Sequence, residues 1–222
     1  MTSIKAVIFD MDGVLIDAKE WHYESLNRAL ATYGFTINRS EHLAVYDGLP
    51  TSKKLELLSR ERGFPRALHK IVNELKQRYT LELIESQCRP RLEHVYALAR
   101  LRREGYTLAV ASNSIRQTVD LMMDKANLSG YFDFMLSNQD VLKPKPHPEI
   151  YLAAIAKAGA SPQECVVVED SHHGIEAATQ AGANVLRVES VEEVTYSRIK
   201  SFIRTVEQDA EFELARRRSR VA

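Results

Sequence analysis

The sequence predicts an α/β fold, a Rossmann-like core around a parallel sheet of five or more strands, with an inserted all-helical cap domain. Short apolar segments alternate with helical patterns along most of the 222-residue chain, which is typical of parallel strands joined by crossover helices. The exception is the stretch 18–89, where helical patterns follow one another without a convincing strand.

The strand candidates are short apolar segments, as expected for parallel strands that are buried on both faces. They are residues 5–9, 107–111, 132–136, 165–168 and 184–188. The amphipathic helical patterns are residues 21–33, 52–62 and 68–84 in the insertion and 115–127 and 174–180 in the core.

These elements divide the chain into a core, a cap and a C-terminal extension. We predict a core of residues 1–17 and 90–190, a cap of residues 18–89, and a C-terminal helix with a basic tail, residues 191–222. The two connections near Asp17 and Pro90 would act as hinges. The tail segment 216–220 is strongly basic but short and has no interleaved aromatic residues, so we expect it to be solvated rather than bound to nucleic acid.

The composition limits the partners of the protein. Thirty basic and thirty acidic side chains cancel, so no bulk field attracts nucleic acid or an anionic membrane. Cys88 and Cys165 lie far apart in the sequence, which argues against a disulfide framework or a structural zinc site. No apolar run approaches the length of a membrane span. We therefore expect a cytoplasmic protein, a monomer or small homo-oligomer, that acts on a small molecule.

Two carboxylates follow the first predicted strand, in the segment 9–14, F-D-M-D-G-V. In extended backbone, residues i and i+2 point to the same side, so Asp10 and Asp12 can face one reaction centre. Gly13 then allows a sharp turn. Taken alone, Asp10 and Asp12 could equally be turn formers, so their interpretation depends on partners elsewhere in the chain.

Three further polar segments follow predicted strands. They are Ser112-Asn113-Ser114, the segment 143–151, K-P-K-P-H-P-E-I-Y, and Glu169-Asp170-Ser171. In an open parallel sheet, ligands bind outside the carboxyl ends of the strands, so these side chains would gather in one crevice. Ser112-Asn113-Ser114 and Glu169-Asp170-Ser171 are also candidate N-caps for the helices that follow, a role compatible with binding phosphate.

The four motifs D-M-D-G-V, A-S-N-S, K-P-H-P-E-I-Y and V-V-V-E-D-S-x-x-G-I-x-A-A-x-x-A-G, in that order, resemble those of the haloacid dehalogenase-like superfamily of aspartyl-nucleophile phosphotransferases. The resemblance covers nearly everything except the C-terminal tail. It is closest to the beta-phosphoglucomutase and sugar-phosphatase subgroup, in which a helical cap follows the first motif. The superfamily pattern K-P-x-P-[DE]-I-Y selects Lys145 and leaves Lys143 as an exposed loop residue.

This resemblance and the chemistry of phosphate esters assign roles to the carboxylates. Asp10 is expected to be the nucleophile, and Asp12 the acid and base, a task suited to a modestly raised pKa. A Mg²⁺ ion would offset the repulsion between these carboxylates and a phosphate dianion. Its expected ligands are Asp10, the backbone carbonyl of Asp12, and Asp170, with Glu169 nearby and acting through water.

Positive and neutral donors complete the expected site. Lys145 would keep the carboxylates ionised and bind phosphate. Ser112 and Asn113 would donate hydrogen bonds to the phosphoryl oxygens, together with N–H groups at the start of the next helix.

The cap residues are less constrained by the sequence. His22 is in helical phase with Leu26 and Leu30 and could be buried, whereas the resemblance suggests a place near the mouth of the cleft. Thr51 occupies a slot that holds an arginine in related sugar phosphate mutases and a Schiff-base lysine in phosphonate-cleaving relatives. This difference weakens both of those interpretations.

Three cap lysines, Lys53, Lys54 and Lys76, could partly replace the missing arginine. Lysines on exposed helix faces are more often simply solvated.

The sequence therefore predicts a Mg²⁺-dependent phosphatase that hydrolyses a small phosphorylated metabolite, a sugar or polyol phosphate, through an aspartyl-phosphate. The alternatives are a hexose-phosphate mutase and a non-catalytic module that binds a phosphate ligand. Thr51 favours water over a second sugar as the acceptor. Haloacid dehalogenation fits poorly, because it has no need of an acid at Asp12.

Overall fold

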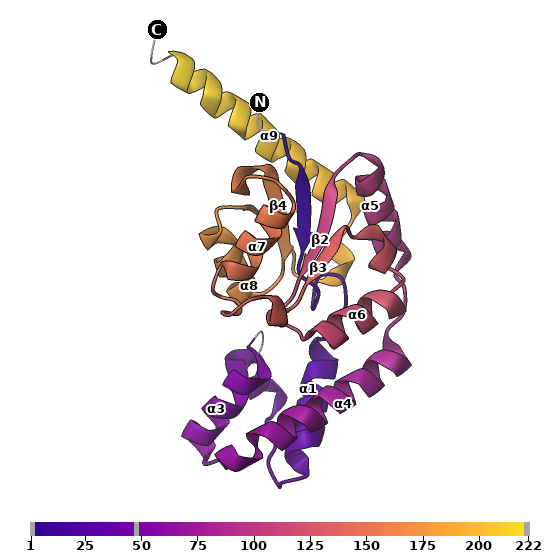
Figure 1. The fold of residues 1–222 in the computed structure, drawn as a ribbon, viewed down its shortest axis with the longest axis vertical. Coiled ribbons are helices and arrows are strands. Elements are labelled where there is room, and N and C mark those ends of the chain that lie inside the picture. The colour runs from indigo at the N-terminus through magenta and orange to yellow at the C-terminus, as the bar shows by residue number, and fades with distance from the viewer. Residues whose placement is uncertain (1–2, 47–48, 220–222) are drawn as a thin grey trace.

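A computed structural model describes the backbone of residues 3–46 and 49–219 and the side chains up to residue 212. Its centre is a five-stranded, all-parallel sheet in the order β3-β2-β1-β4-β5 (Figure 1). The strands are β1 (Ala6–Phe9), β2 (Thr107–Ala111), β3 (Phe134–Leu136), β4 (Cys165–Glu169) and β5 (Asn184–Arg187). The predicted Rossmann-like core is confirmed.

The helices alternate with the strands in the core and follow one another in the insertion. They are α1 (Lys19–Ala31), α2 (Arg39–Glu41), α3 (Thr51–Arg62), α4 (His69–Gln87), α5 (Leu92–Arg103), α6 (Arg116–Lys125), α7 (Glu149–Lys157), α8 (His172–Gln180) and α9 (Tyr196–Ser219). A π-helical turn, His42–Tyr46, continues α2, and short 3₁₀ turns lie at Arg66–Leu68, Ser129–Tyr131, Asn138–Asp140, Pro162–Glu164 and Val191–Glu193.

Helices cover both faces of the sheet (Figure 1). The apolar cluster that contains residues of α5, α6 and α9 takes Val7, Phe9, Leu108, Val110, Val166 and Val168 from the strands. The cluster that contains residues of α7 and α8 takes Ala6, Ile8, Ala109, Ala111, Cys165 and Val167. Because both faces are buried, the central strands β1, β2 and β4 are apolar along almost their whole length rather than alternating in polarity.

The register of the sheet brings the strand ends to one level. Phe9 of β1 pairs with Val110 of β2 on one side and with Val168 of β4 on the other. The residues that follow these strands therefore emerge at the same edge of the sheet.

The cap is a helical unit with its own apolar core. That core joins α1, α3, α4 and the segments between them, and consists of Leu26, Ala29, Leu30, Ile37, Tyr46, Leu55, Leu58, Phe64 and Val72. In Figure 1 these helices lie beyond the carboxyl edge of the sheet. The inserted helical cap is thus confirmed, while the domain boundaries drawn from the sequence stay predictions.

The two connections between the cap and the core lie close to one another. The indole Nε1 of Trp21, near the start of α1, donates a hydrogen bond to Oε1 of Gln87 at the end of α4, at 2.8 Å. Ile84 and Cys88 are buried in the core's own apolar cluster. The two predicted hinge regions are therefore tied together at one place.

The capping predictions have different outcomes for the two helices. Ser171 is the N-cap of α8, and its hydroxyl accepts a hydrogen bond from the N–H of Gly174 at 3.1 Å. The prediction that Ser112-Asn113-Ser114 caps the next helix is wrong. Ile115 is the N-cap of α6 without a side-chain bond, and the N–H of Arg116 donates to Oε1 of Gln139 at 2.8 Å. The serine hydroxyls are used elsewhere.

The C-terminal extension is helical along its described length. Ile199 and Ile203 of α9 are buried against the core, whereas the end of the helix projects away from the body (Figure 1). The backbone helix continues to Ser219 and so includes part of the segment expected to be a solvated tail. No helix in the described part of the chain is both long and apolar enough to span a membrane.

We predict that Gly174→Ala destabilises the protein, although alanine is normally the better helix former. A Cβ atom at Gly174 would overlap with the carboxylate of Glu169, which is fully buried. We expect a loss of about 3 kcal/mol or more in the free energy of unfolding, at the upper end of overpacking costs. Urea denaturation would measure it.

Gly130→Ala is the matched control for this prediction, because a Cβ atom there would meet nothing within 4 Å. Its effect should stay within about 1 kcal/mol. Equal stability of the two variants would contradict the close contact between α8 and β4.

Candidate active site

A cleft lies between the carboxyl edge of the sheet and the cap, with a volume of about 220 Å³. Its core side is formed by residues that follow β1, β2, β3 and β4, and its cap side by residues of α1, α3 and α4 and the segment just before α3. The core residues are Asp10, Asp12, Asn113, Ser114, Ile115, Thr118, Asn138, Lys145, Asp170, Ser171 and His173. All four segments that were predicted to gather here line the cleft. The segment 143–151 contributes only Lys145, and each of the other three contributes two residues.

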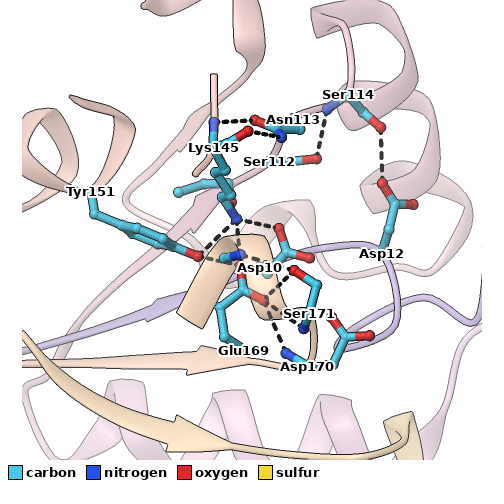
Figure 2. Close-up of polar contacts among 12 residues, drawn as sticks. Asp10, Asp12, Ser112, Asn113, Ser114, Lys145, Tyr151, Glu169, Asp170 and Ser171 are labelled. Atoms are coloured by element: carbon cyan, nitrogen blue, oxygen red, sulfur yellow. Dashed lines mark hydrogen bonds and ion pairs between the residues drawn. The ribbon is translucent and has the colours of Figure 1, made fainter. Parts of the chain in front are cut away.

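Lys145 is the centre of the polar network (Figure 2). Its side chain is 3% exposed, and Nζ lies 2.6 Å from Oδ1 of Asp10 and 2.7 Å from Oε1 of Glu169. Nζ also donates to the carbonyl oxygen of Ala111 at 2.9 Å and lies 2.7 Å from the hydroxyl of Tyr151. An ammonium group has three N–H donors, so these four acceptors share them. Lys143 is exposed, as predicted.

Glu169 forms an ion pair with Lys145, and both of its carboxylate oxygens accept further hydrogen bonds. Its Oε1 accepts a hydrogen bond from the hydroxyl of Tyr151 at 2.7 Å. Its Oε2 accepts from the N–H groups of Asp170 and Ser171, at 3.0 and 3.1 Å, and from the hydroxyl of Ser171 at 3.1 Å. With both oxygens used and no exposed surface, Glu169 is better suited to positioning Lys145 than to direct metal binding.

The buried charges shift one another's pKa values. Burial would lower the pKa of Lys145, but Asp10 and Glu169 raise it. Burial would raise the pKa of Glu169, but Lys145 and its hydrogen bonds lower it, so this pair is charged. At Asp10, burial outweighs Lys145 and raises the pKa well above its ordinary value, aided by the neighbouring carboxylates. Lys145 lowers the pKa of Asp10 by less than burial raises it, so the expectation that Lys145 keeps the carboxylates ionised stays a prediction at Asp10.

Asp12 lies in different surroundings from Asp10, because its partners come from the next strand end and from the cap. The hydroxyl of Ser114 donates to Oδ2 of Asp12 at 2.9 Å, and Nε2 of His22 lies 3.1 Å from Oδ1. Burial raises the pKa of Asp12, but His22 and Ser114 together lower it below its ordinary value. The expectation of a raised pKa is wrong for this arrangement, because His22 and Ser114 stabilise the charged carboxylate of Asp12.

Ser112 and Asn113 both form hydrogen bonds with the protein backbone, and Asn113 also lines the cleft. The hydroxyl of Ser112, which is 1% exposed, accepts a hydrogen bond from the N–H of Ser114 at 3.0 Å. The amide of Asn113 brackets Lys145: Oδ1 accepts its N–H at 3.0 Å, and Nδ2 donates to its carbonyl oxygen at 3.3 Å. Asn113 therefore fixes the loop that carries the buried lysine, whatever else it binds.

Asp170 fits the role of a metal ligand. Its side chain is 1% exposed, and its Oδ1 is buried without a hydrogen-bond partner among the described residues. Nζ of Lys19, in α1, lies 2.8 Å from Oδ2. One carboxylate oxygen each from Asp10, Glu169 and Asp170 lie within 4.8 Å of one another, a set of hard oxygen donors that suits Mg²⁺. Gly13 makes room for this carboxylate, because a Cβ atom there would overlap with Asp170.

The predicted cap residues do not all lie in the cleft. His22, Thr51 and Lys76 line it, and Nδ1 of His22 lies 3.1 Å from Nζ of Lys76. Burial and Lys76 lower the pKa of His22. Lys53 is exposed and lines a neighbouring cavity, while Lys54, one residue further along α3, is 7% exposed and lines the cleft.

Several residues that the structure places in or beside the cleft had no role assigned to them from the sequence. Ser114 and Tyr151 lie within motifs that were recognised, but no role was assigned to their side chains. Helical phase could have separated Lys54 from Lys53, because Lys54, Leu55 and Leu58 share the buried face of α3. No motif or periodic pattern in the sequence marked Lys19 or His173 as residues of the cleft.

Comparison with known proteins identifies the family of this chain. The haloacid dehalogenase-like hydrolase family matches residues 7–188. A phosphorylated carbohydrates phosphatase of Thermotoga maritima is 32% identical over 182 residues, which cover 81% of this chain and 82% of that protein. Pyrophosphatase PpaX of Bacillus cereus is 30% identical over 195 residues, with 83% of each chain covered.

Solved structures with the same fold include beta-phosphoglucomutase from Clostridium difficile, with a TM-score of 0.78, 22% identity, and coverage of 91% of this chain and 98% of that one. At this identity the likeness concerns the fold. A family hydrolase from Deinococcus radiodurans, with bound phosphate and sodium, has a TM-score of 0.63 and 28% identity, over 84% of this chain and 81% of that one. The prediction that the protein is an enzyme of this type is confirmed, and the chain belongs to the haloacid dehalogenase-like hydrolase family.

Proposed function

We propose that the protein is a Mg²⁺-dependent phosphatase that hydrolyses a small phosphorylated metabolite, a sugar or polyol phosphate, through an aspartyl-phosphate. The observation that carries this proposal is the separation of partners at two adjacent carboxylates. Asp10 contacts the buried Lys145, whereas Asp12 contacts Ser114 and the cap residue His22. Two carboxylates in such different surroundings can take different roles in one reaction.

In the first step, Asp10 acts as the nucleophile. Lys145 holds its Oδ1, and Oδ2 attacks phosphorus. The bond from phosphorus to the ester oxygen breaks, and Asp12 gives its proton to that oxygen. A leaving group bound beside Asp12 takes over the place of His22 and removes the contact that lowers the pKa of Asp12.

In the second step, water attacks the phosphorus of the aspartyl-phosphate while Asp12 accepts a proton from that water. The bond between Asp10 and phosphorus breaks, which releases inorganic phosphate, regenerates the carboxylate of Asp10 and leaves Asp12 protonated for the next cycle. Positive charge and hydrogen-bond donors around the transferring group stabilise both transition states. Lys145, the hydroxyl of Ser112 and the N–H groups at the start of α6 would supply them.

The carboxylate cluster supports a role for Mg²⁺. Asp10, Asp170 and the backbone carbonyl of Asp12 would hold the ion, with Glu169 behind them as the support of Lys145. When bound, Mg²⁺ offsets the repulsion between these carboxylates and the substrate and polarises a phosphoryl oxygen. The partnerless oxygen of Asp170 and the raised pKa of Asp10 are features that a divalent cation would relieve.

The size and lining of the cleft support a small substrate and water as the acceptor. The cleft volume of about 220 Å³ suits a small metabolite better than a polymer. Thr51 lines it at the start of α3 and brings no positive charge to grip a second sugar phosphate. A hexose-phosphate mutase stays the second candidate function, because beta-phosphoglucomutase from Clostridium difficile has the same fold as this protein. We retain a cytoplasmic location and a monomeric or small homo-oligomeric state as parts of this proposal.

Asp10→Asn should abolish phosphate release while leaving the protein folded, because the amide keeps the shape of the side chain but is not a nucleophile. We expect a loss of at least about 10³-fold in kcat, in line with the loss of a covalent step. The measurement is phosphate release from a panel of sugar, polyol and nucleotide phosphates, with magnesium and with chelator. Circular dichroism and thermal unfolding would check the fold of the variant.

The same panel separates the candidate functions. Full activity of Asp10→Asn would exclude Asp10 as the nucleophile. Phosphate release that persists in the presence of chelator would exclude a requirement for Mg²⁺. If wild-type protein released phosphate from no compound, the mutase would be favoured, and a test for exchange between sugar phosphate isomers would decide.

Asp170→Asn should weaken Mg²⁺ binding by about tenfold or more, because it removes a ligand charge from the proposed site. Isothermal titration calorimetry of the ligand-free protein would measure this without reference to activity. The matched control is Asp120→Asn, since the side chain of Asp120 is about half exposed in α6 and lies 3.6 Å from Arg116, away from the cleft. Equal Mg²⁺ affinity in the two variants would exclude Asp170 as a ligand.

A further inference from the structure

Two histidines and a glutamate gather at the start of α8, beside the cleft but apart from its carboxylate cluster. They are His172, His173 and Glu176. Residues three and four apart on a helix lie on one face, and Glu176 is three residues after His173 and four after His172. The spacing therefore brings both imidazole rings and the carboxylate to the same side of the helix.

The ligand atoms of these side chains lie close enough together to share one ion. One ring nitrogen of each histidine and one carboxylate oxygen of Glu176 lie within 4.8 Å of one another. The two rings stand edge to face, with centroids 5.9 Å apart and an angle of 83° between their planes. Atoms bound to one Zn²⁺ ion, each at about 2.1 Å from it, lie roughly 3.5 Å apart. His172 and Glu176 are exposed, so small side-chain rotations bring the atoms to that spacing.

These side chains keep capacity to bind a metal ion. Nδ1 of His173 is buried and has no hydrogen-bond partner among the described residues. A buried ring nitrogen in this state calls for an explanation, and a bound ion is one of the usual ones. Glu176 accepts a hydrogen bond at Oε1 from Nε2 of Gln180, at 3.0 Å, and a carboxylate has further lone pairs for a cation.

The backbone beneath the cluster is firmly held. The hydroxyl of Ser171 accepts a hydrogen bond from the N–H of Gly174, and Gly174 packs so closely on Glu169 that a Cβ atom would overlap with its carboxylate. Ligands that project from a fixed backbone lose less freedom when they bind an ion. The positive end of the helix dipole disfavours a cation, but at an exposed position this effect is weak compared with coordination by imidazole nitrogens.

The donor set differs from that of the proposed Mg²⁺ site. Two imidazoles and one carboxylate suit Zn²⁺ and the neighbouring transition metals, whereas Mg²⁺ prefers oxygen ligands such as those of Asp10 and Asp170. The place is also different, because His173 lines the cleft while Glu176 lines a neighbouring cavity of about 790 Å³. The cluster therefore lies on the wall between the two cavities.

We propose that His172, His173 and Glu176 form a second metal site, which binds a borderline divalent cation of the Zn²⁺ class. Three protein ligands leave a fourth position on such an ion for water or for a ligand from either cavity. The site is distinct from the proposed Mg²⁺ site, and the proposal does not depend on the phosphatase function.

The test is calorimetric titration of Zn²⁺ into protein that carries no histidine tag, in excess Mg²⁺ to occupy the carboxylate cluster. We expect one Zn²⁺ ion per chain. His172→Ala and Glu176→Gln should each weaken this binding by at least about tenfold, because each removes one of the three ligands. Both residues are exposed, so both variants should fold, and circular dichroism would check this.

His147→Ala is the matched control. His147 is also exposed and lies near a carboxylate, with Nδ1 at 3.8 Å from Oε2 of Glu149. It should keep the wild-type Zn²⁺ affinity within about twofold, since it removes no ligand of the proposed site. Equal Zn²⁺ affinity in wild type and His172→Ala, or an equal loss in His147→Ala, would overturn the site.

A reciprocal measurement separates this site from the carboxylate cluster. Asp170→Asn should keep the Zn²⁺ affinity within about threefold, and His172→Ala should keep the Mg²⁺ affinity to the same extent, because each variant leaves the other ligand set intact. Loss of Zn²⁺ binding in Asp170→Asn would assign the ion to the carboxylates and refute the histidine site. Zn²⁺ binding that depends on His172 would support the site even if no phosphate ester is hydrolysed, a result that counts against the phosphatase alone.

Discussion

The buried ammonium group of Lys145 is the interaction on which the rest of the site depends. It is 3% exposed and joins Asp10 after β1, the carbonyl of Ala111 in β2, and Glu169 in β4. An unpaired charge there would be very costly, so each of these groups must be held in place. Tyr151 completes the arrangement from α7: burial and the nearby carboxylates raise its pKa, so its hydroxyl keeps its proton and donates to Glu169. One charge thereby aligns the ends of three strands.

Much of this arrangement could be predicted from the sequence, because it depends on parallel strand topology. Once five apolar strands alternate with helices, the residues after each strand must meet at one edge, and Lys145 rather than Lys143 follows from a motif. The roles within that edge depend on tertiary contacts that no spacing contains. Asn113, for which a phosphate-binding role stays a prediction, also brackets the backbone of Lys145. Helical phase places Lys54 rather than Lys53 on the buried face of α3, but only the structure shows that Lys54 lines the cleft.

The cap was harder to predict than the core for a related reason. Helical periodicity identifies which residues of α1 face inward, but inward can mean the apolar core of the cap or the cleft. His22 lies four residues before the buried Leu26 and still contacts Asp12 rather than packing into that core. Short irregular segments, such as the π-helical turn His42–Tyr46, have no periodic signal at all. The sequence therefore predicted least well which cap side chains face the core across the cleft.

Two contacts cross the cleft from the cap to carboxylates of the core. Lys19 contacts Asp170 at 2.8 Å, and His22 contacts Asp12 at 3.1 Å, so α1 supplies cations and donors to the core's carboxylates. A divalent cation and a substrate would compete for these same two carboxylates. Ligand binding then exchanges contacts within the protein for contacts with the ligands, and the net free energy of closure stays small. If the protein is the phosphatase proposed above, such a balance would let the cap exclude water during the reaction and release product afterwards.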